Sequence, residues 1–367
     1  MLHIAIIDPV GQKAGLDHYD RCLAKALNNR FCNVKIYSNF SDVNNESIIE
    51  NHFTFTFRND LLKLPRLIKE YFSALRKAEA DKTGIIIIHI FHSSIIDFLF
   101  IRLADLFGFR ICLIIHDVES LIHQQRKTWI SKCVNLASYV IVHNNLSYDE
   151  LIERIKPADK GKVFIIPHGN YVGLQEKTES DQTAAYFNLD SNKIYLLFFG
   201  MIKRSKGLEV LIDAMKDIPA NVDLIIAGRT RNISFIHYET LIRKLNLLHR
   251  VHPIIRYITN TERNLLFNFA DLAILPYQRI YQSGVMLLAM SYGIPVIASD
   301  LPANKLIIDD KNGTLFKVGD SSDLAAKIND LIADEGKRNY ISECAREFVT
   351  INNDWNKIGD DFLKIFN

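Results

Sequence analysis

The sequence predicts an α/β protein of two doubly wound, Rossmann-like domains that face a central cleft. Three observations lead to this fold class. Short apolar runs rich in Ile, Val and Leu alternate with longer amphipathic stretches. The runs are continuous in apolar residues, which is typical of parallel strands buried on both faces. The alternation stops once, in a polar segment at 171–192, and then resumes. At roughly 150 residues per domain, 367 residues accommodate two domains.

The first domain is expected over residues 1–170. Its strands are predicted where β-branched apolar residues cluster, at 4–8, 34–37, 85–89, 111–116, 139–142 and 163–167. Between them, apolar residues from Leu16 to Leu27 recur at helical spacing, which predicts a helix over 16–28. A second helix is expected over 60–77.

A linker over 171–192, with room for a short helix, and a second domain over 193–350 follow. The second domain's strands are expected at 194–199, 223–227, 251–254, 272–275 and 295–298. Its helices are expected at 207–218, 236–246, 261–269, 284–292, 323–333 and 336–349. A C-terminal helix within 351–367 closes the chain, after a polar break. In open parallel sheets, ligands bind beyond the carboxyl ends of the strands, so we expect the chemistry in the loops that follow strands.

Composition narrows the class of protein. Lys and Arg exceed Asp and Glu by 44 − 42 = +2, so no strong field attracts nucleic acid. The five cysteines are scattered, with neither a zinc spacing nor a disulfide framework, which favours a reducing compartment. The N-terminal apolar run lacks a preceding basic region and indicates a strand, not a signal peptide. We therefore expect a cytoplasmic protein, with the inner face of the cytoplasmic membrane as a further location.

The first domain offers two candidate loops. The loop at 9–15 contains Gly11 and Gly15 before a helix, so its backbone can approach a ligand closely; a plain tight turn is the alternative. The strand at 111–116 runs into His116 and Asp117. A histidine at a strand end suits proton transfer or a hydrogen bond to a sugar hydroxyl. The alternative is a histidine that bonds only to neighbouring backbone.

The second domain offers two candidate anion sites. Lys203, Arg204 and Lys206 precede a glycine at a helix start, which indicates a diphosphate site rather than a solvated basic turn. A second loop, after residue 275, leads through Tyr277 and Gln282 to a helix that Ser283 can cap. Free amides at that helix start, from Gly284 onward, can also accept an anion, with ordinary capping as the alternative.

The helix at 60–77 combines an apolar stripe with a local excess of positive charge. Five cations stand against two acidic residues, a local charge of 5 − 2 = +3. This pattern is typical of a helix that lies on an anionic membrane surface. An ordinary surface helix packed on the sheet is the alternative. The stripe is Leu61, Leu64, Ile68, Phe72 and Leu75.

Missing motifs also restrict the function. We find no P-loop, no G-x-S-x-G, no H-E-x-x-H and no D-x-D triplet. We therefore expect neither a metal nor another cofactor. The absence of G-x-G-x-x-G disfavours a dehydrogenase, and the absence of an export signal disfavours a solute-binding protein.

Four runs, in order, resemble the donor-binding half of family 4 and related glycosyltransferases of GT-B fold. They are FFGMIKRSKGLEVLIDAM, DLIIAGR, ADLAILPYQRIYQSGVMLLAMSYGIPVIASD and KNGTLF, within 194–316. The first half is similar to the acceptor-binding domain through its glycine-containing loop and His116-Asp117. The segment after Trp355 is similar to the helix that crosses back to the N-terminal domain.

The resemblance implies roles for particular residues. Lys203 and Lys206 would bind the diphosphate, and Arg229 would border the donor. Ser283 and Gly284 would present backbone amides to the phosphates. His116 would contact the transferred sugar or position the acceptor. The full donor-binding set is Gly15, Lys203, Lys206, Arg229, Tyr277, Gln282, Ser283 and Gly284.

The sequence departs from the family at one place. Most relatives carry two glutamates eight residues apart, and the corresponding positions here are Ile280 and Leu288. A third glutamate is replaced by Lys305. The anomeric outcome therefore stays open. An inverting enzyme would need a general base, for which the candidates are Asp17, Asp20, His116 and Asp117.

The resemblance implies a metal-independent hexosyltransferase. It would move a sugar from a UDP- or GDP-sugar to a glycan or lipid-linked oligosaccharide acceptor, in surface polysaccharide or glycoconjugate synthesis. The alternative is a catalytically inactive GT-B-like subunit that binds a nucleotide or a partner. The expected contacts are the nucleotide sugar, the acceptor and an anionic membrane through 60–77, without nucleic acid.

Overall fold

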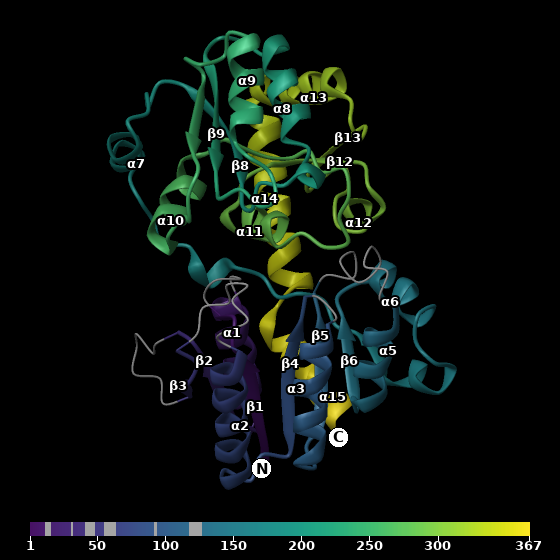
Figure 1. The fold of residues 1–367 in the computed structure, drawn as a ribbon. Helices are drawn as coiled ribbons and strands as arrows, with labels where there is room; N and C mark the ends of the chain where they lie inside the picture. Colours follow the sequence, from purple (N-terminus) through teal and green to yellow (C-terminus); the bar gives the residue numbers. More distant parts are fainter. Residues whose placement is uncertain (12–15, 31, 41–47, 55–63, 92–93, 117–126) are drawn as a thin grey trace. The chain divides into compact units, whose positions relative to one another are not determined.

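The computed structural model folds into two compact units. The first contains Met1–Gly169 together with Asn353–Asn367, and the second contains Asn170–Asn352 (Figure 1). The structure describes all residues except 12–15, 31, 41–47, 55–63, 92–93 and 117–126. The second unit is thus inserted into the chain of the first.

The sheet of the first unit is parallel, with strand order β3-β2-β1-β4-β5-β6-β7. Its strands are β1 (Leu2–Asp8), β2 (Cys32–Ser38), β3 (Ile49–Asn51), β4 (Ile85–Ile90), β5 (Arg110–Ile115), β6 (Tyr139–Val142) and β7 (Val163–Ile165). The order reverses at β1, so this sheet is doubly wound. Such a reversal is where α/β proteins place their ligands.

Helices cover the sheet of the first unit. They are α1 (Leu16–Asn28), α2 (Leu64–Ala80), α3 (Ile95–Leu106), α5 (Lys127–Leu136), α6 (Asn145–Ile152) and α15 (Trp355–Phe366). The last of these packs beside α1, where Gly359 faces Ala26 and Asp360 pairs with Arg30. Ile358, Phe362 and Phe366 of α15 join the apolar core under the sheet. The C-terminal helix is therefore part of the first unit's core.

The second unit has a six-stranded parallel sheet with order β10-β9-β8-β11-β12-β13. The strands are β8 (Ile194–Phe199), β9 (Val222–Ala227), β10 (Val251–Ile254), β11 (Leu272–Leu275), β12 (Val296–Ser299) and β13 (Thr314–Phe316). The predicted fold class, with two Rossmann-like sheets, is confirmed. β13 and β3 were not predicted, because neither contains more than two consecutive apolar residues.

Two apolar clusters lie on opposite faces of this sheet. One contains side chains of α8 (Leu208–Ala214), α9 (Ile236–Lys244) and α13 (Ser321–Ala333). The other contains side chains of α11 (Gly284–Tyr292) and α14 (Glu335–Asn352), with α10 (Asn260–Phe269) beside them. A sheet buried on both faces explains why its strands are apolar without alternation. The short α12 (Pro302–Lys305) precedes β13.

The segment 171–192, predicted as a linker, belongs to the second unit. It includes α7 (Ser180–Phe187), which lies beside α10. Thr183 is buried, and its hydroxyl donates to the Leu265 carbonyl at 3.4 Å. The backbone amide of Glu176 donates to Asn264 at 3.0 Å. These polar contacts fix the segment on the second unit, although its sequence lacks the apolar periodicity from which a packed helix is predicted.

Within the described ranges, no helix combines the length and apolar character needed to cross a bilayer.

Candidate functional site

The carboxyl ends of neighbouring strands in the first unit carry a cluster of histidines. His89 lies near the end of β4, His116 follows β5, His143 follows β6 and His168 comes after β7. Asp8 ends β1, next to β4 in the sheet. Because parallel strands end at the same edge, these side chains gather there, at the edge where α/β proteins bind ligands. We call these five residues the histidine cluster.

A chain of short hydrogen bonds runs through the cluster. His89 Nε2 lies 2.7 Å from Oδ1 of Asp20, and His89 Nδ1 lies 2.8 Å from Nε2 of His116. The side chain of Asp20 is 0% exposed and that of His89 is 2% exposed. A buried carboxyl is therefore linked, through one imidazole, to a second imidazole that ends the chain of bonds.

Tyr19 of α1 sits in the middle of the cluster. Its ring makes edge contacts with His89, His116, His143 and His168 at centroid distances of 5.5, 5.3, 6.0 and 5.0 Å. The ring of Trp355, the first residue of α15, lies 5.0 Å from Tyr19 on another side. Aromatic packing on this scale fixes the orientations of the imidazoles.

Burial shifts the pKa values in the cluster. Desolvation lowers the pKa of His89 to about 4 and that of His143 to about 3. Desolvation also lowers the pKa of His168 to about 4, and it takes the pKa of His116 well below its ordinary value. These imidazoles are therefore neutral at pH 7. Neutral imidazoles accept and donate hydrogen bonds to hydroxyl groups, whereas cations would be needed to hold a diphosphate.

The pKa values of two buried acids, Asp8 and Asp20, are raised. Desolvation and, next, the charge of the neighbouring Asp20 raise the pKa of Asp8 to about 7, against the effect of His89. Desolvation also raises the pKa of Asp20 well above its ordinary value. Buried carboxyls with raised pKa values are typical of sites that do acid–base chemistry.

His143 has one ring nitrogen without a partner. Its Nδ1 donates to the Ile166 carbonyl at 2.9 Å, which leaves Nε2 as an acceptor. That nitrogen is buried and finds no hydrogen-bond donor among the residues that the structure describes. Leaving a buried acceptor unpaired costs about 1–3 kcal/mol, so a hydroxyl donor placed at this nitrogen would be bound favourably.

A second candidate site lies at the strand ends of the second unit, where three loops meet. The backbone amide of Ile202, after β8, donates to the Arg229 carbonyl, after β9, at 2.9 Å. The amide of Gln278, after β11, donates to the Ser205 carbonyl at 2.9 Å. β9, β8 and β11 are neighbours in the sheet, so the loops that follow them line one edge.

Glycines allow these loops to approach one another. A Cβ on Gly228 (φ +146°) would lie 1.8 Å from the Gly200 carbonyl oxygen, and one on Gly207 (φ +62°) would lie 1.9 Å from the Pro276 carbonyl oxygen. Neither position has room for a side chain. Lys206, which directly precedes Gly207, is thereby held against the loop after β11.

Three of the predicted donor-binding residues, Lys203, Lys206 and Ser283, lie around Tyr277, which is fully buried. Lys206 Nζ lies 3.4 Å from the centroid of the Tyr277 ring. Burial raises the pKa of the Tyr277 hydroxyl to about 12, and the side chain of Ser283 and the charge of Lys203 act against that rise. Ser283 also caps α11, because its hydroxyl accepts from the Met286 amide at 3.2 Å. The structure therefore brings Lys203, Lys206 and Ser283 together.

The remaining predicted residues have varied locations. Arg229 is exposed on the loop after β9, and Gln282 and Gly284 are partly exposed at the start of α11. Asp17 is half-buried in the first turn of α1, where its charge acts on the raised pKa of Asp20. The predictions for Gly15 and Asp117 lie outside the described residues.

Sequence reasoning did not single out His89 or Asp8, the two cluster members that contact Asp20. A signal was present: His89, His116 and His143 are each 27 residues apart (116 − 89 = 143 − 116 = 27). Equal spacing over successive strand–helix units returns each histidine to the same edge of the sheet. Across the described parts of the chain, no group of three His, Cys, Asp or Glu side chains is arranged to hold a metal ion.

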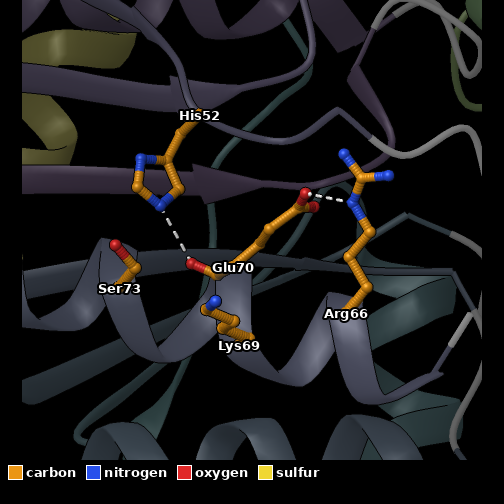
Figure 2. Close-up of a pocket in the computed structure, with 5 residues that line it drawn as sticks. All are labelled: His52, Arg66, Lys69, Glu70 and Ser73. Carbon is orange, nitrogen blue, oxygen red and sulfur yellow. Dashed lines mark hydrogen bonds and ion pairs between the residues drawn. The ribbon is translucent and has the colours of Figure 1, made fainter.

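A polar hollow of about 520 Å³ lies beside α2 (Figure 2). His52 and the α2 residues Arg66, Lys69, Glu70 and Ser73 line it. His52 Nε2 lies 2.9 Å from the Glu70 carbonyl oxygen, and Arg66 Nε donates to the Glu70 carboxylate at 3.0 Å. The Arg66 charge is thus partly neutralised. The hollow gives α2 a polar, cationic edge.

The fold and the two strand-end sites define a protein of GT-B architecture. Solved GT-B structures match the whole chain: the crystal structure of HepE from Anabaena, in complex with UDP and glucose, has a TM-score of 0.79 at 21% identity. That match covers 100% of this chain and 99% of HepE. At this identity the likeness establishes the fold.

Residues 180–348, which lie within the second unit, match the glycosyl transferases group 1 family. Residues 90–154 match the glucosyltransferase 3-like, N-terminal domain. The predicted resemblance to GT-B glycosyltransferases is therefore confirmed. The group 1 match contains all of the donor-binding residues predicted for the second domain.

Curated relatives are similar over part of the chain. D-inositol 3-phosphate glycosyltransferase of Xylanimonas cellulosilytica is 27% identical over 226 residues, 57% of this chain and 52% of that protein. GDP-mannose:glycolipid 4-beta-D-mannosyltransferase of Xanthomonas campestris pv. campestris is 32% identical over 117 residues, 31% of this chain and 33% of that protein. The chain thus spans between a third and about half the length of these relatives.

Proposed function

We propose that this protein is a glycosyltransferase that moves a sugar from a nucleotide-diphosphate sugar to a glycan or lipid-linked acceptor, in surface polysaccharide or glycoconjugate synthesis. One observation carries the proposal: Lys203, Lys206 and the Ser283 cap of α11 gather around the buried Tyr277. That arrangement lies inside the segment that matches the glycosyl transferases group 1 family.

The cations and helix start suit a diphosphate leaving group. When the bond between the sugar and the diphosphate breaks, negative charge develops on the phosphate oxygens. Lys203 and Lys206 supply positive charge, and the first amides of α11 supply hydrogen-bond donors with a favourable helix dipole. We propose that these groups stabilise the departing diphosphate without a metal ion.

The donor base is proposed as uracil or guanine. HepE was crystallised with UDP and glucose, and the name of the Xanthomonas relative specifies GDP-mannose. Both precedents are hexose donors, which supports a hexosyl group as the transferred unit. We propose that the histidine cluster of the first unit binds hydroxyl groups of the sugar or the acceptor.

Loss of the two lysine charges tests the donor site. We expect Lys203→Met and Lys206→Met each to weaken UDP or GDP binding about tenfold or more, because each removes one charge from a diphosphate. Calorimetry with each nucleotide measures the affinity, and transfer assays with EDTA measure turnover. Lys216→Met, an exposed lysine paired with Asp213, is the matched control. Unchanged affinity and turnover in both lysine variants would refute the site.

A partner or nucleotide-binding subunit without turnover is the second candidate. Ile280 and Leu288 stand where most relatives carry glutamates, and both pack into the apolar core beside α11. No acidic group from these positions can therefore reach the donor. Nucleotide binding by the wild type, without transfer to any acceptor of a broad panel, would favour this candidate over the enzyme.

We also propose a peripheral contact between 60–77 and an anionic membrane at the inner face of the cytoplasmic membrane. Ile68 and Phe72 of α2 are each 44% exposed, and Leu99 of the adjacent α3 is 54% exposed. Within α2 the charge is 4 − 2 = +2. Leu75, predicted on the outer stripe, is buried in the core, so the exposed stripe is narrower than predicted.

Vesicle flotation tests the membrane contact. Wild-type protein should float with phosphatidylglycerol vesicles at low salt and less with neutral vesicles. The double variant Ile68→Asp/Phe72→Asp should reduce binding more than tenfold, because burying two such side chains contributes about 3 kcal/mol or more. Ile236→Asp, at an exposed isoleucine of the second unit, is the control. Equal flotation of all three proteins would contradict the contact.

A further inference from the structure

The hydrogen-bonded chain Asp20–His89–His116 can exist in two proton states that keep both bonds. In the first, ionised Asp20 accepts from His89 Nε2–H, and His89 Nδ1 accepts from His116 Nε2–H. His116 Nδ1 then carries a lone pair. In the second, Asp20 is protonated and donates to His89 Nε2, and His89 Nδ1–H donates to His116 Nε2. His116 Nδ1 then carries a proton.

The two states differ by one proton, yet both imidazoles are neutral in each. This matters because the chain is buried, and burial penalises an imidazolium far more than a neutral ring. A proton that arrives at His116 Nδ1 is passed on until it rests on Asp20, where it removes a buried negative charge. His116 is the end of the chain opposite Asp20, so a substrate that exchanges a proton with the chain meets it there.

We propose that Asp20, His89 and His116 form a proton relay whose outer nitrogen, Nδ1 of His116, is the general base for the acceptor hydroxyl. His116 is the catalytic residue, because it touches the reacting hydroxyl. His89 and Asp20 are positioning residues that act through it. The inference rests on the proposed glycosyl transfer and adds to it the base that the chain uses.

The step balances in atoms and charge. The acceptor oxygen forms a bond to C1 of the donor sugar, while the bond from C1 to the diphosphate oxygen breaks and its electron pair leaves on the diphosphate. The acceptor proton goes to His116 Nδ1. The His116 Nε2 proton moves to His89 Nδ1, and the His89 Nε2 proton moves to Asp20. No oxidant, metal or further reactant is needed.

The surroundings of the relay contain few charges. Asp8 of β1 interacts with both Asp20 and His89, and Asp17 of α1 acts on Asp20. His143 and His168 face His116 from the next strands, and both are neutral at pH 7. His18 faces His168, and Tyr19 covers the middle. Among the described residues, Asp8 is therefore the acid besides Asp20 whose charge is shown to act on His89.

Two substitutions distinguish proton transfer by Asp20 and His89 from a purely structural role of these residues. In Asp20→Asn, the amide oxygen still accepts from His89 Nε2–H, but it cannot take the proton. In His89→Gln, the side-chain amide can bond to both neighbours, but it cannot pass a proton between them. We expect each variant to lower kcat at least about a hundredfold at saturating donor and acceptor.

The pH profile supplies a readout that packing alone does not move. Wild-type kcat should fall toward low pH as Asp20 becomes protonated. In Asp20→Asn the base is the imidazole of His116 alone, whose lowered pKa moves this acid limb to lower pH. His252→Gln is the matched control, since His252 Nε2 lies 2.8 Å from buried Asp223 in the other unit. Its profile should equal that of wild type.

Nitrogen NMR of histidine-labelled protein tests the relay without any assay of activity. His89 and His116 should switch their protonated nitrogen from Nε2 to Nδ1 together, at one pH, with neither ring becoming an imidazolium. Separate titrations, or no switch between pH 4 and 9, would overturn the relay, as would variants with an unmoved acid limb. A wild type that shows the joint switch but transfers no sugar would instead refute the proposed function.

Discussion

The buried His143 should make the first unit sensitive to mild acid. Its Nδ1 donates to a backbone carbonyl and burial lowers its pKa to about 3, so the folded protein keeps it neutral. An unfolded chain has an ordinary histidine, with a pKa near 6.5. Below that pH the unfolded chain binds a proton that the folded chain does not, so the free energy of unfolding falls as the pH falls.

The size of the effect follows from the two pKa values. Between pH 7 and pH 5, the unfolded histidine goes from about one-quarter to nearly fully protonated, while the folded one stays neutral. Integrating this difference gives a loss of about 2 kcal/mol from His143 alone. In His143→Gln this loss is removed, because glutamine does not titrate but can still donate to the Ile166 carbonyl.

Tryptophan fluorescence reports on the unfolding of the first unit, which contains His143. The chain contains two tryptophans, Trp129 in α5 and Trp355 at the start of α15, and both belong to the first unit. Urea unfolding at pH 7 and pH 5, followed by this fluorescence, gives the two free energies. Wild type should lose about 2 kcal/mol more than His143→Gln over this interval.

The variant His249→Gln provides the control, because His249 is an exposed residue of the second unit. Its pH response should follow that of wild type. If His143→Gln loses as much stability as wild type between the two pH values, then His143 titrates normally in the folded state. In that case the closed, neutral histidine cluster described above is wrong.

Three further predictions concern the second unit. Gly228→Ala should destabilise the second unit by about 3 kcal/mol or more, because the new Cβ would lie 1.8 Å from the Gly200 carbonyl oxygen. In the control variant Gly161→Ala, the new Cβ has open space around it, so thermal unfolding should match that of wild type. Glu262→Gln should lower the free energy of unfolding by about 1–2 kcal/mol at pH 7, because Arg256 lowers the pKa of Glu262 to about 2. Urea unfolding should show that this difference from wild type vanishes as the pH falls from 4.5 to 2. Arg250→Met should lower the free energy of unfolding by about 3–5 kcal/mol, measured by calorimetry, because the buried guanidinium donates to four backbone carbonyls. If Arg250→Lys were as stable as wild type, this explanation would be wrong.

The strands of the fold were readable from the sequence because they are buried on both faces. Ile194–Phe199 and Leu272–Leu275 have the predicted bounds, since continuous apolar runs are flanked by polar loops. β3 and β13 were missed because each lies in a run of only two consecutive apolar residues, whereas the equally short β7 lies in a run of four. α7 is the short helix for which the predicted linker had room, and polar contacts, such as that of Thr183, hold it in place.

The two candidate sites differed in how far they could be predicted from the sequence. Lys203, Lys206 and Ser283 stand out in the sequence, because charge and capping residues follow strands directly. The contact of Lys206 with Tyr277 depends on Gly207, whose tight approach to Pro276 only the structure reveals. The link from His89 to Asp20 joins residues 69 positions apart, and no local pattern encodes such a pairing.

The insertion of one unit into the other sets the order of events during synthesis on the ribosome. α15 supplies Ile358, Phe362 and Phe366 to the core of the first unit, and Asn353 donates to the His168 carbonyl at 2.6 Å. The amino-terminal half therefore emerges with the part of its core that α15 covers still exposed, and α15 follows only after the whole of Asn170–Asn352 has been translated. The inserted unit, complete in itself, is free to finish folding first.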